Sequence, residues 1–312
     1  MSTSGSDAND GSASDATHAF RTIDHALDTI QSGYTINISP GTYSGGISTD
    51  REGRCAPERL TLIADSERGA VVIDARNAAG GAGIRLSNGD DSIIDGFTII
   101  NSPGSGILIK SQSDRLEIRN CIIRGSGSDG IHIQDSSDVL IFNNLIYGNN
   151  GIGIALVGDG GSPGGRVINN TVALNAGRGI EIGRSDGASG GAFTRNNVIQ
   201  DNSTANASGE NIKVFDNSSS DYDGNRNLVS PPVYIRQTIA GPDDVQTDAR
   251  FDAASATTTN AEGFRLRTSS PAIDRGATDF DSALVEFLTE RSTTTAGNAD
   301  LGPIDIGYHF PR

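Results

Sequence analysis

Aliphatic residues recur along this chain in one short alternating pattern: glycine (asparagine in the last copy), isoleucine, a variable residue and a second aliphatic residue. The first isoleucines of successive copies lie 23, 24, 23, 26 and 32 residues apart, at Ile84, Ile107, Ile131, Ile154, Ile180 and Ile212. A repeat length of roughly 20 to 50 residues is typical of a solenoid, in which each repeat packs on its neighbours. The pattern therefore predicts a stacked, repetitive fold.

Each repeat contains three apolar segments separated by turn residues. In the repeat that begins near residue 128 these segments read GIHIQ, VLIFNN and LIYGNN. Short apolar runs bounded by Gly, Asn and Asp are typical of strands. Three strands per repeat predict one coil of a parallel β-helix, with successive coils about 4.8 Å apart. The isoleucines of the repeated pattern then point inward, and the residue between them points outward.

The segments that flank the repeats predict the two ends of a single domain, 1–312. Apolar residues at helical spacing in FRTIDHALDTI predict a short amphipathic helix within 18–31, which would cap the first coil. Coils are expected over 34–230. Residues 231–312 are expected to form a final coil and a wrapped tail that covers the other end. Within this tail, DSALVEFLTE predicts a second short helix.

A column of asparagines supports the register of the coils. Asn120, Asn144, Asn170 and Asn197 are placed at the same point of successive repeats, just before the third strand. Stacked asparagines can form hydrogen bonds from coil to coil, so an inner ladder is expected here. In the same alignment Cys121 occupies the position that Leu145, Thr171 and Val198 occupy in the other repeats. It is therefore expected as a buried thiol, and a disulfide with Cys55 is the less favoured alternative.

Composition narrows the possible partners. The formal net charge is -15, and the bases are 22 arginines and only two lysines. Nucleic-acid binding needs a basic face, so no nucleic-acid partner is expected. Membrane insertion is not expected either, because no segment approaches the roughly 18 consecutive apolar residues of a spanning helix. The polar stretch after Met1 has no signal-peptide pattern and is interpreted as the start of a mature chain.

Segments at both ends of the chain resemble a known group. GSDANDGS, AFRTIDHALDTI and INISPGTY near the start, and SPAIDRG and DLGPIDIG near the end, resemble secreted right-handed parallel β-helix proteins related to pectate lyases. The resemblance covers nearly the whole chain. It implies an all-β, right-handed parallel β-helix located outside the cell or on its surface and acting on polysaccharides. The fold hosts lyases, hydrolases, epimerases and proteins with no known activity, so it leaves the reaction open.

Candidate chemistry lies on the outward positions of the repeated strand. One column of outward positions holds Arg85, Leu108, His132, Ala155, Glu181 and Lys213, and a second holds Ser87, Lys110, Gln134, Val157, Gly183 and Phe215. Arg85, Lys110 and His132 lie within about three coils, so their side chains could meet within roughly 10 Å. These outward positions are where a substrate is expected.

A polysaccharide lyase is the preferred hypothesis for this face. Such an enzyme needs a base beside the uronate carboxylate, a cation that neutralises the carboxylate, and an acid for the leaving oxygen. Lys110 or His132 could be the base, and Arg85 could bind the carboxylate. Gln134 and Lys213 are candidates for substrate binding.

Calcium is a candidate cofactor, because the resemblance implies it and calcium takes several oxygen ligands. The acids expected nearest this face, and so the candidate metal ligands, are Asp129, Asp135 and Glu181.

Two alternatives to the lyase stay open. A glycoside hydrolase needs two carboxyl groups beside the sugar bond. SDGIHI at 128–133 loosely resembles the polygalacturonase segment around its first catalytic acid, but the following coil has Asn149 and Asn150 where a pair of aspartates is expected. The other alternative is a non-catalytic rod for carbohydrate binding or cell-surface structure. The small apolar residues Ala155 and Val157 in the middle of the face favour it.

Overall fold

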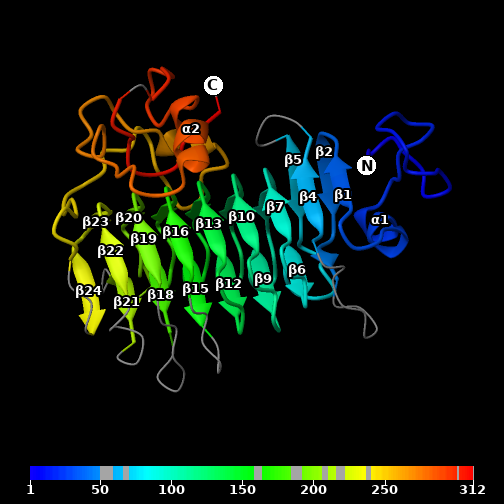
Figure 1. Ribbon diagram of the computed structural model, residues 1–312, viewed down its shortest axis with the longest axis horizontal. Helices are drawn as coiled ribbons and strands as arrows, with labels where there is room; N and C mark the ends of the chain where they lie inside the picture. Colours follow the sequence, from blue (N-terminus) through cyan, green and yellow to red (C-terminus); the bar gives the residue numbers. More distant parts are fainter. Residues whose placement is uncertain are drawn as a thin grey trace.

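Three long parallel sheets make up the body of the computed structural model (Figure 1). The structure describes residues 1–49, 59–65, 70–157, 164–183, 192–205, 210–215, 222–236, 240–300 and 302–311. Each sheet has eight strands, and the chain visits the sheets in the order A, B, C before it begins the next coil. Three strands per coil are what the sequence predicted, and the all-β parallel β-helix is confirmed.

The strands of each sheet are short, and every pair is parallel. Sheet A contains β1 (Thr35–Ile38), β4 (Thr61–Ala64), β7 (Ile93–Asp95), β10 (Glu117–Arg119), β13 (Leu140–Phe142), β16 (Arg166–Ile168), β19 (Phe193–Arg195) and β22 (Asp223–Asn225). Sheet B contains β2 (Gly41–Ser44), β5 (Val71–Asp74), β8 (Thr98–Ile100), β11 (Ile122–Arg124), β14 (Leu145–Tyr147), β17 (Thr171–Ala173), β20 (Val198–Gln200) and β23 (Leu228–Ser230). Sheet C contains β3 (Ile47–Ser48), β6 (Ile84–Ser87), β9 (Ile107–Lys110), β12 (Ile131–Gln134), β15 (Ile154–Val157), β18 (Ile180–Ile182), β21 (Glu210–Val214) and β24 (Val233–Arg236).

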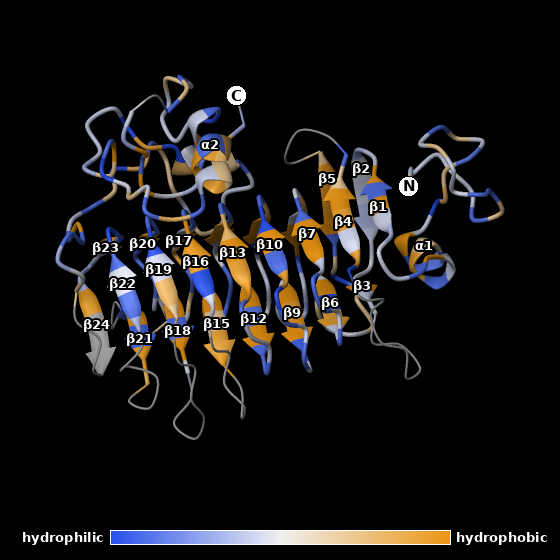
Figure 2. Ribbon diagram, viewed as in Figure 1, coloured by the Kyte–Doolittle hydropathy of each residue, from blue (hydrophilic) through white to orange (hydrophobic). Residues whose placement is uncertain are grey.

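The repeated pattern forms sheet C, and its isoleucines stack in register. Ile131 pairs with Ile107 on one side and with Ile154 on the other, and all three are fully buried. The glycine before each of the first five isoleucines is required by close packing. A Cβ on Gly130 would collide with Ile146 Cγ2 of sheet B and would lie 2.6 Å from the Gly153 carbonyl oxygen. The core is thus a stack of aliphatic side chains, and Figure 2 shows the hydrophobic residues concentrated in the strands.

An asparagine ladder runs along the turn between sheets A and B. Its members, whose side chains are joined by hydrogen bonds of 2.9 to 3.0 Å, are Asn144, Asn170, Asn197 and Asn227. Each ladder amide also satisfies backbone groups at the turn. Asn170, for example, accepts from the Asn144 backbone N–H and donates to the Ile141 carbonyl. The expected ladder is therefore present.

Two placements at the start of this ladder were wrong by one residue. Strand register aligns Ile122 with Leu145, so Cys121 takes the ladder position and Asn120 aligns with Asn143. The Cys121 N–H donates to Asn144 Oδ1 at 2.8 Å, and Asn143 Nδ2 donates to Asn120 Oδ1 at 3.1 Å. Cys121 is fully buried, as predicted, and Cys55 lies outside the described residues.

A second ladder, which the sequence did not reveal, runs along the turn between sheets B and C. Its side chains are joined by hydrogen bonds of 2.8 to 2.9 Å, and its members are Asn149, Asn175, Asn202 and Asn211. Asn149 also accepts from the Ser126 backbone N–H and is 1% exposed. The asparagine at the place of an expected catalytic aspartate is therefore part of the internal scaffold.

The two ends of the chain pack on the coils in different ways. Helix α1 (Ile23–Thr29) places Ile23 and Ala26 in the main core cluster, beside Ile36 of β1, which fits the predicted cap. At the other end, Val245 pairs with Leu228 and extends sheet B by one bridge. The tail then folds back along the solenoid, so it covers much more than the end that the sequence predicted.

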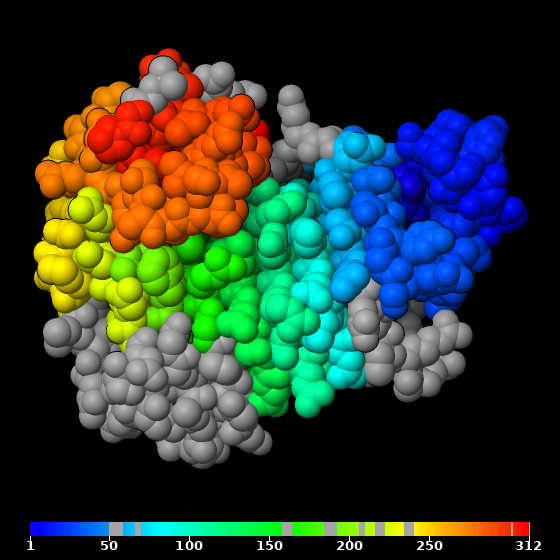
Figure 3. All heavy atoms as spheres, in the orientation of Figure 1, coloured from blue at the N-terminus to red at the C-terminus, as the bar shows by residue number. Residues whose placement is uncertain are grey.

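The tail covers the outer faces of sheets A and B. Helix α2 (Ser282–Thr289) packs Leu288 and Phe287 against Leu140 and Phe142 of sheet A. A second apolar cluster joins the tail to sheet B, where Tyr147 contacts Phe264 of the 3₁₀ helix η2 (Ala261–Phe264). Figure 3 shows the tail, coloured orange to red, lying over the green coils. In the described part of the chain, no helix has the length and apolar character to cross a membrane.

Candidate functional site

Sheet C presents the outer face that carries the predicted chemistry. The apolar clusters that hold the tail contain residues of sheets A and B, and in Figure 1 the tail and sheet C lie at opposite edges of the view. Strand register places the first outward column in the predicted order, Arg85, Leu108, His132, Ala155, Glu181 and Lys213. In the second column Ser87 pairs with Lys110, and Gln134 pairs with Val157.

His132 is held in a defined orientation by an acid on the preceding turn. Its Nδ1 lies 2.7 Å from Asp129 Oδ2, and the two side chains are 26% and 12% exposed. The other oxygen of Asp129 accepts the Ile152 backbone N–H at 2.7 Å. Because a carboxylate accepts, Nδ1 carries the proton, and Nε2 of the neutral ring is left able to accept one. The Asp129 contact thus fixes which ring nitrogen of His132 faces away from the protein partner.

Lys110 and Arg85 flank this histidine on the side of the earlier coils. Lys110 lies one strand away from His132 and two residues further along the strand direction, while Arg85 lies two strands away. In the described residues Lys110 makes no side-chain hydrogen bond or ion pair. The strand register places Arg85, Lys110 and His132 on the outer face of three neighbouring strands, β6, β9 and β12, and Gln134 lies two residues after His132.

Glu181 and Lys213 form a separate ionic group on the later coils. Glu181 Oε2 lies 2.9 Å from Arg178 Nη1 and 3.7 Å from Lys213 Nζ, and Arg178 in turn reaches Glu210 at 2.5 Å. The Lys213 ammonium also lies 4.0 Å from the centre of the Phe215 ring. The fully buried Ala155 stands between this group and His132. Lys213 is therefore placed away from the cationic patch and beside an acid.

The three acids proposed as metal ligands are not brought together. Asp129 uses both oxygens within the protein, and Glu181 is engaged by two cations two strands away. Asp135 lies beyond the end of β12 with φ of 56°, in the left-handed region, which a short polar side chain tolerates. Their positions favour roles in orientation, ion pairing and turn formation over a shared cation.

Among the described residues, one cluster of acids in the tail could hold a metal ion. Oxygens of Asp274, Asp300 and Asp305 all lie within 4.8 Å of one another. Burial, followed by the nearby Asp300 carboxylate, raises the pKa of Asp305. The cluster sits in the tail over the turn between sheets A and B, where Asn169 Nδ2 donates to the Asp305 carbonyl. A cation bound there would stabilise the tail and would not reach a substrate on sheet C.

Protein donors already occupy much of this cluster. Asp300 Oδ2 lies 2.7 Å from Nε2 of the fully buried His309 and accepts the Asp305 N–H at 2.8 Å. Both side-chain oxygens of Asp305 also accept, from the Asp274 N–H and from the Thr293 hydroxyl. Calcium takes six to eight oxygen ligands, so it would have to displace these donors. These hydrogen bonds fit a network that holds the tail in place better than they fit a calcium site.

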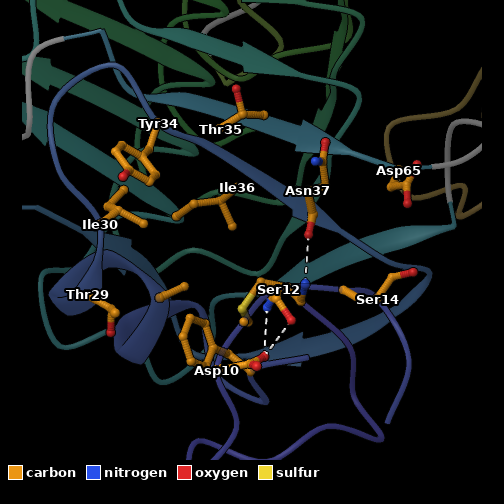
Figure 4. Close-up of a pocket in the computed structure, with 15 residues that line it drawn as sticks. Asp10, Ser12, Ser14, Thr29, Ile30, Tyr34, Thr35, Ile36, Asn37 and Asp65 are labelled. Atoms are coloured by element: carbon orange, nitrogen blue, oxygen red, sulfur yellow. Dashed lines mark hydrogen bonds between the residues drawn. The ribbon is translucent and has the colours of Figure 1, made fainter. Parts of the chain in front are cut away.

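A pocket of about 370 Å³ lies at the N-terminal end, between residues 10–14, α1 and β1 (Figure 4). Its walls include Ile30, Ile36 and Tyr34, and the Tyr34 side chain is 52% exposed. Its charged side chains, Asp10 and Asp65, are both acidic.

The architecture of three stacked parallel sheets defines the class of this protein, the parallel β-helix proteins. Residues 63–227, more than half of the chain, match the model of the right-handed β-helix region. The chain belongs to this family, and the predicted resemblance to pectate lyase-like β-helix proteins is confirmed at the level of the fold.

Solved structures resemble the chain in fold at low sequence identity. The pectate lyase Pel9A is 13% identical with a TM-score of 0.55, over 100% of this chain and 96% of that chain. The pectin methylesterase of Aspergillus niger is 13% identical with a TM-score of 0.46, over 75% of this chain and 85% of its own. A rhamnogalacturonan lyase is 15% identical with a TM-score of 0.42, over 73% of each chain. No curated protein matches the sequence significantly.

The pairing of Asp129 with His132 is the feature of the site that the sequence reasoning missed. Asp129 was assigned to a metal, although it stands three residues before His132. The signal was present in that spacing, because a residue in the turn that enters a strand can reach the second residue of the strand. Only the folded turn shows that the two side chains meet.

Proposed function

We propose that this protein is an extracellular or cell-surface carbohydrate-active enzyme that cleaves an acidic, uronate-containing polysaccharide by β-elimination on sheet C. The observation that carries the proposal is the oriented His132, whose Nε2 can accept a proton, beside the guanidinium of Arg85 and the ammonium of Lys110, which makes no hydrogen bond or ion pair with the described residues. In a chain of net charge -15, a cationic patch that draws in a polyanion is a local exception.

The residues have distinct roles in the proposed reaction. Lys110 and Arg85 bind the uronate carboxylate and neutralise it, which makes the adjacent C–H more acidic. His132 Nε2 removes that proton, a carbon–carbon double bond forms, and the bond to the glycosidic oxygen breaks. The departing oxygen gains a proton from an acid such as the Lys110 ammonium. Asp129 keeps the histidine in the reactive tautomer.

In this proposal the acids of sheet C do not hold calcium on their own, and calcium is tested as a component of the substrate complex. The described acids of sheet C are engaged with protein donors, as shown above. Activity that survives a chelator would agree with carboxylate neutralisation by Lys110 and Arg85 alone.

The test is to incubate the protein with pectate and with alginate, with calcium and with a chelator, and to follow the ultraviolet absorbance of the unsaturated product. His132→Ala is expected to lower the rate by about 10²–10⁴-fold, the usual contribution of a general base. Lys110→Ala is expected to lower it strongly as well. Asp129→Asn should reduce kcat and change the pH profile while leaving KM nearly unchanged, because Asp129 positions the base and does not touch substrate.

Arg76→Ala is a matched control, since Arg76 is an exposed arginine of the sheet B side that pairs with Asp74. It should keep full activity. Full activity of both the His132→Ala and Lys110→Ala variants would overturn the assigned site. New reducing ends without the absorbance would indicate a hydrolase. Binding without turnover would indicate the non-catalytic alternative, which the buried Ala155 and Val157 in the middle of the face favour.

A further inference from the structure

A second pocket lies on a different face of the solenoid, where the tail stops covering sheet B. Its volume is about 330 Å³, near the lower end of the range for ligand sites, so it suits one small molecule. Val72, Ile100 and Ile122 line its floor on the outer face of sheet B. Its far wall belongs to the tail and includes Tyr308 and Phe310.

Arg124 lines this pocket and lacks a polar partner. Other half-buried arginines of the described chain are engaged: Arg119 pairs with Asp95 and Glu117, and Arg265 pairs with Glu262. Arg124 makes no hydrogen bond or ion pair within the described residues. Arg124 is half-buried, so its guanidinium lies at the pocket without an acidic partner from the described residues and is available to an anionic ligand.

Thr98 supplies a second polar group without a partner. Its side chain is 9% exposed and lines the same pocket, and its Oγ1 has no hydrogen-bond partner in the described structure. Register pairs Thr98 with Ile122 and Ile100 with Arg124, so Thr98 and Arg124 lie diagonally on adjacent strands of one face. A guanidinium and a hydroxyl can both donate to one anion at this separation.

The neighbouring carboxylates do not neutralise Arg124. Glu262, at the rim, is paired with Arg265, and Asp74, beside Ile100 in the register, is paired with Arg76 and accepts from Asn101. The pocket thus combines an apolar floor with two unsatisfied donors. Its chemistry is complementary to a compact ring that carries a carboxylate.

We propose that this pocket is a binding site for a small carboxylate, separate from the patch on sheet C. The carboxylate binds the Arg124 guanidinium and the Thr98 hydroxyl, and the body of the ligand packs on Ile100 and Ile122. Two kinds of ligand carry such a carboxylate, a single uronate sugar and an apolar ring acid. They share the carboxylate and differ only in the ring that packs on Ile100 and Ile122.

The experiment measures binding of D-galacturonate and of benzoate to the full chain by calorimetry or ligand-observed NMR, with galactose and benzamide as neutral counterparts. At least one acid should bind more tightly than its neutral counterpart. Arg124→Gln is expected to raise the Kd of that acid by about tenfold or more, since hydrogen bonds to charged groups contribute strongly. Thr98→Val, which is nearly isosteric, should raise it several-fold. Binding of galacturonate alone would identify the sugar source, and binding of benzoate alone the apolar one.

Arg166→Gln is the matched control. Arg166 is an exposed arginine on sheet A, and the substitution removes the same charge as Arg124→Gln does. It should leave the Kd unchanged, as should Lys110→Ala, which separates this site from the proposed catalytic patch. Thr98→Val should unfold at or above the temperature of the unaltered protein, because it removes a buried hydroxyl that has no hydrogen-bond partner in the described structure. Arg124→Gln should unfold at nearly the same temperature, because the half-buried Arg124 makes no ion pair with the described residues. Equal binding of acids and neutral counterparts, no binding of either acid, or an unchanged Kd in Arg124→Gln would overturn the proposal.

Discussion

At the scale of single residues, the alternation within the repeated pattern separates packing from chemistry. Ile131 and Ile133 are fully buried, while His132 between them is half-buried on the outer face of the same strand. Gly130 completes the unit, because its missing side chain makes room for Ile146 of the neighbouring sheet. Inward positions therefore tolerate little change, and outward positions are available to function.

Gly130→Ala is expected to destabilise the protein by about 1–3 kcal/mol, the usual cost of overpacking a core. The added methyl group would overlap Ile146 and approach the Gly153 carbonyl oxygen. Gly80→Ala is the control, since the nearest atom to its new Cβ would be Arg85 Cδ at 3.6 Å. Urea denaturation of both variants measures the difference. Equal midpoints would contradict the packing argument.

At the scale of elements, the two asparagine ladders link the strands of one coil to those of the next. Each ladder follows a turn, and at the turn between sheets A and B the residues before the ladder have positive φ: Asn120, Asn143, Asn169 and Asn196, at 54° to 59°. Asparagine is among the few residues that adopt this conformation readily. The same residue type thus serves the backbone shape at one position and the buried hydrogen bonds at the next.

Asn170→Ala is expected to lower the free energy of unfolding by about 3 kcal/mol or more. It would leave the Asn144 N–H and the Ile141 carbonyl buried without their partners, and each such loss costs about 1–3 kcal/mol. Asn150→Ala, at an exposed position one residue after the second ladder, should change stability little. Thermal or urea unfolding of the two variants checks this. A loss in Asn170→Ala no larger than in Asn150→Ala would count against the ladder.

At the scale of the whole molecule, the tail closes two of the three faces of the solenoid. Its contacts reach far back in the chain: Tyr147 donates to the Thr258 carbonyl at 3.0 Å, and the His309 N–H donates to Asn143 Oδ1 at 2.6 Å. Burial under the tail raises the pKa of Tyr147 to about 12. The tail thereby covers the outer faces of sheets A and B and forms one wall of the pocket at Arg124.

The raised pKa of Tyr147 predicts alkaline sensitivity. Its folded-state pKa lies above the unfolded value of about 10, so its contribution to stability is complete below pH 10 and is lost as the pH rises toward 12. Tyr147→Phe should cost about 1 kcal/mol at neutral pH through the lost hydrogen bond. The free energy of unfolding of this variant should also decline less between pH 10 and 12 than that of the unaltered protein. Denaturation midpoints at several pH values test this, and an unchanged decline would show that Tyr147 does not couple the tail to alkaline pH.

Local pattern was sufficient for the coils and for the candidate residues on them. The period of the isoleucines predicts a solenoid, and the three short apolar segments of each repeat make its coil that of a parallel β-helix. The alternation puts Arg85, Lys110 and His132 outward. Contacts between distant segments depend on how the chain folds back. Four features therefore appear only in three dimensions. They are the one-residue shift of Asn120, the second ladder, the hydrogen bond between Asp129 and His132, and the pocket at Arg124. A repeat pattern records what each strand buries, whereas tertiary structure decides which faces stay open and which polar groups meet there.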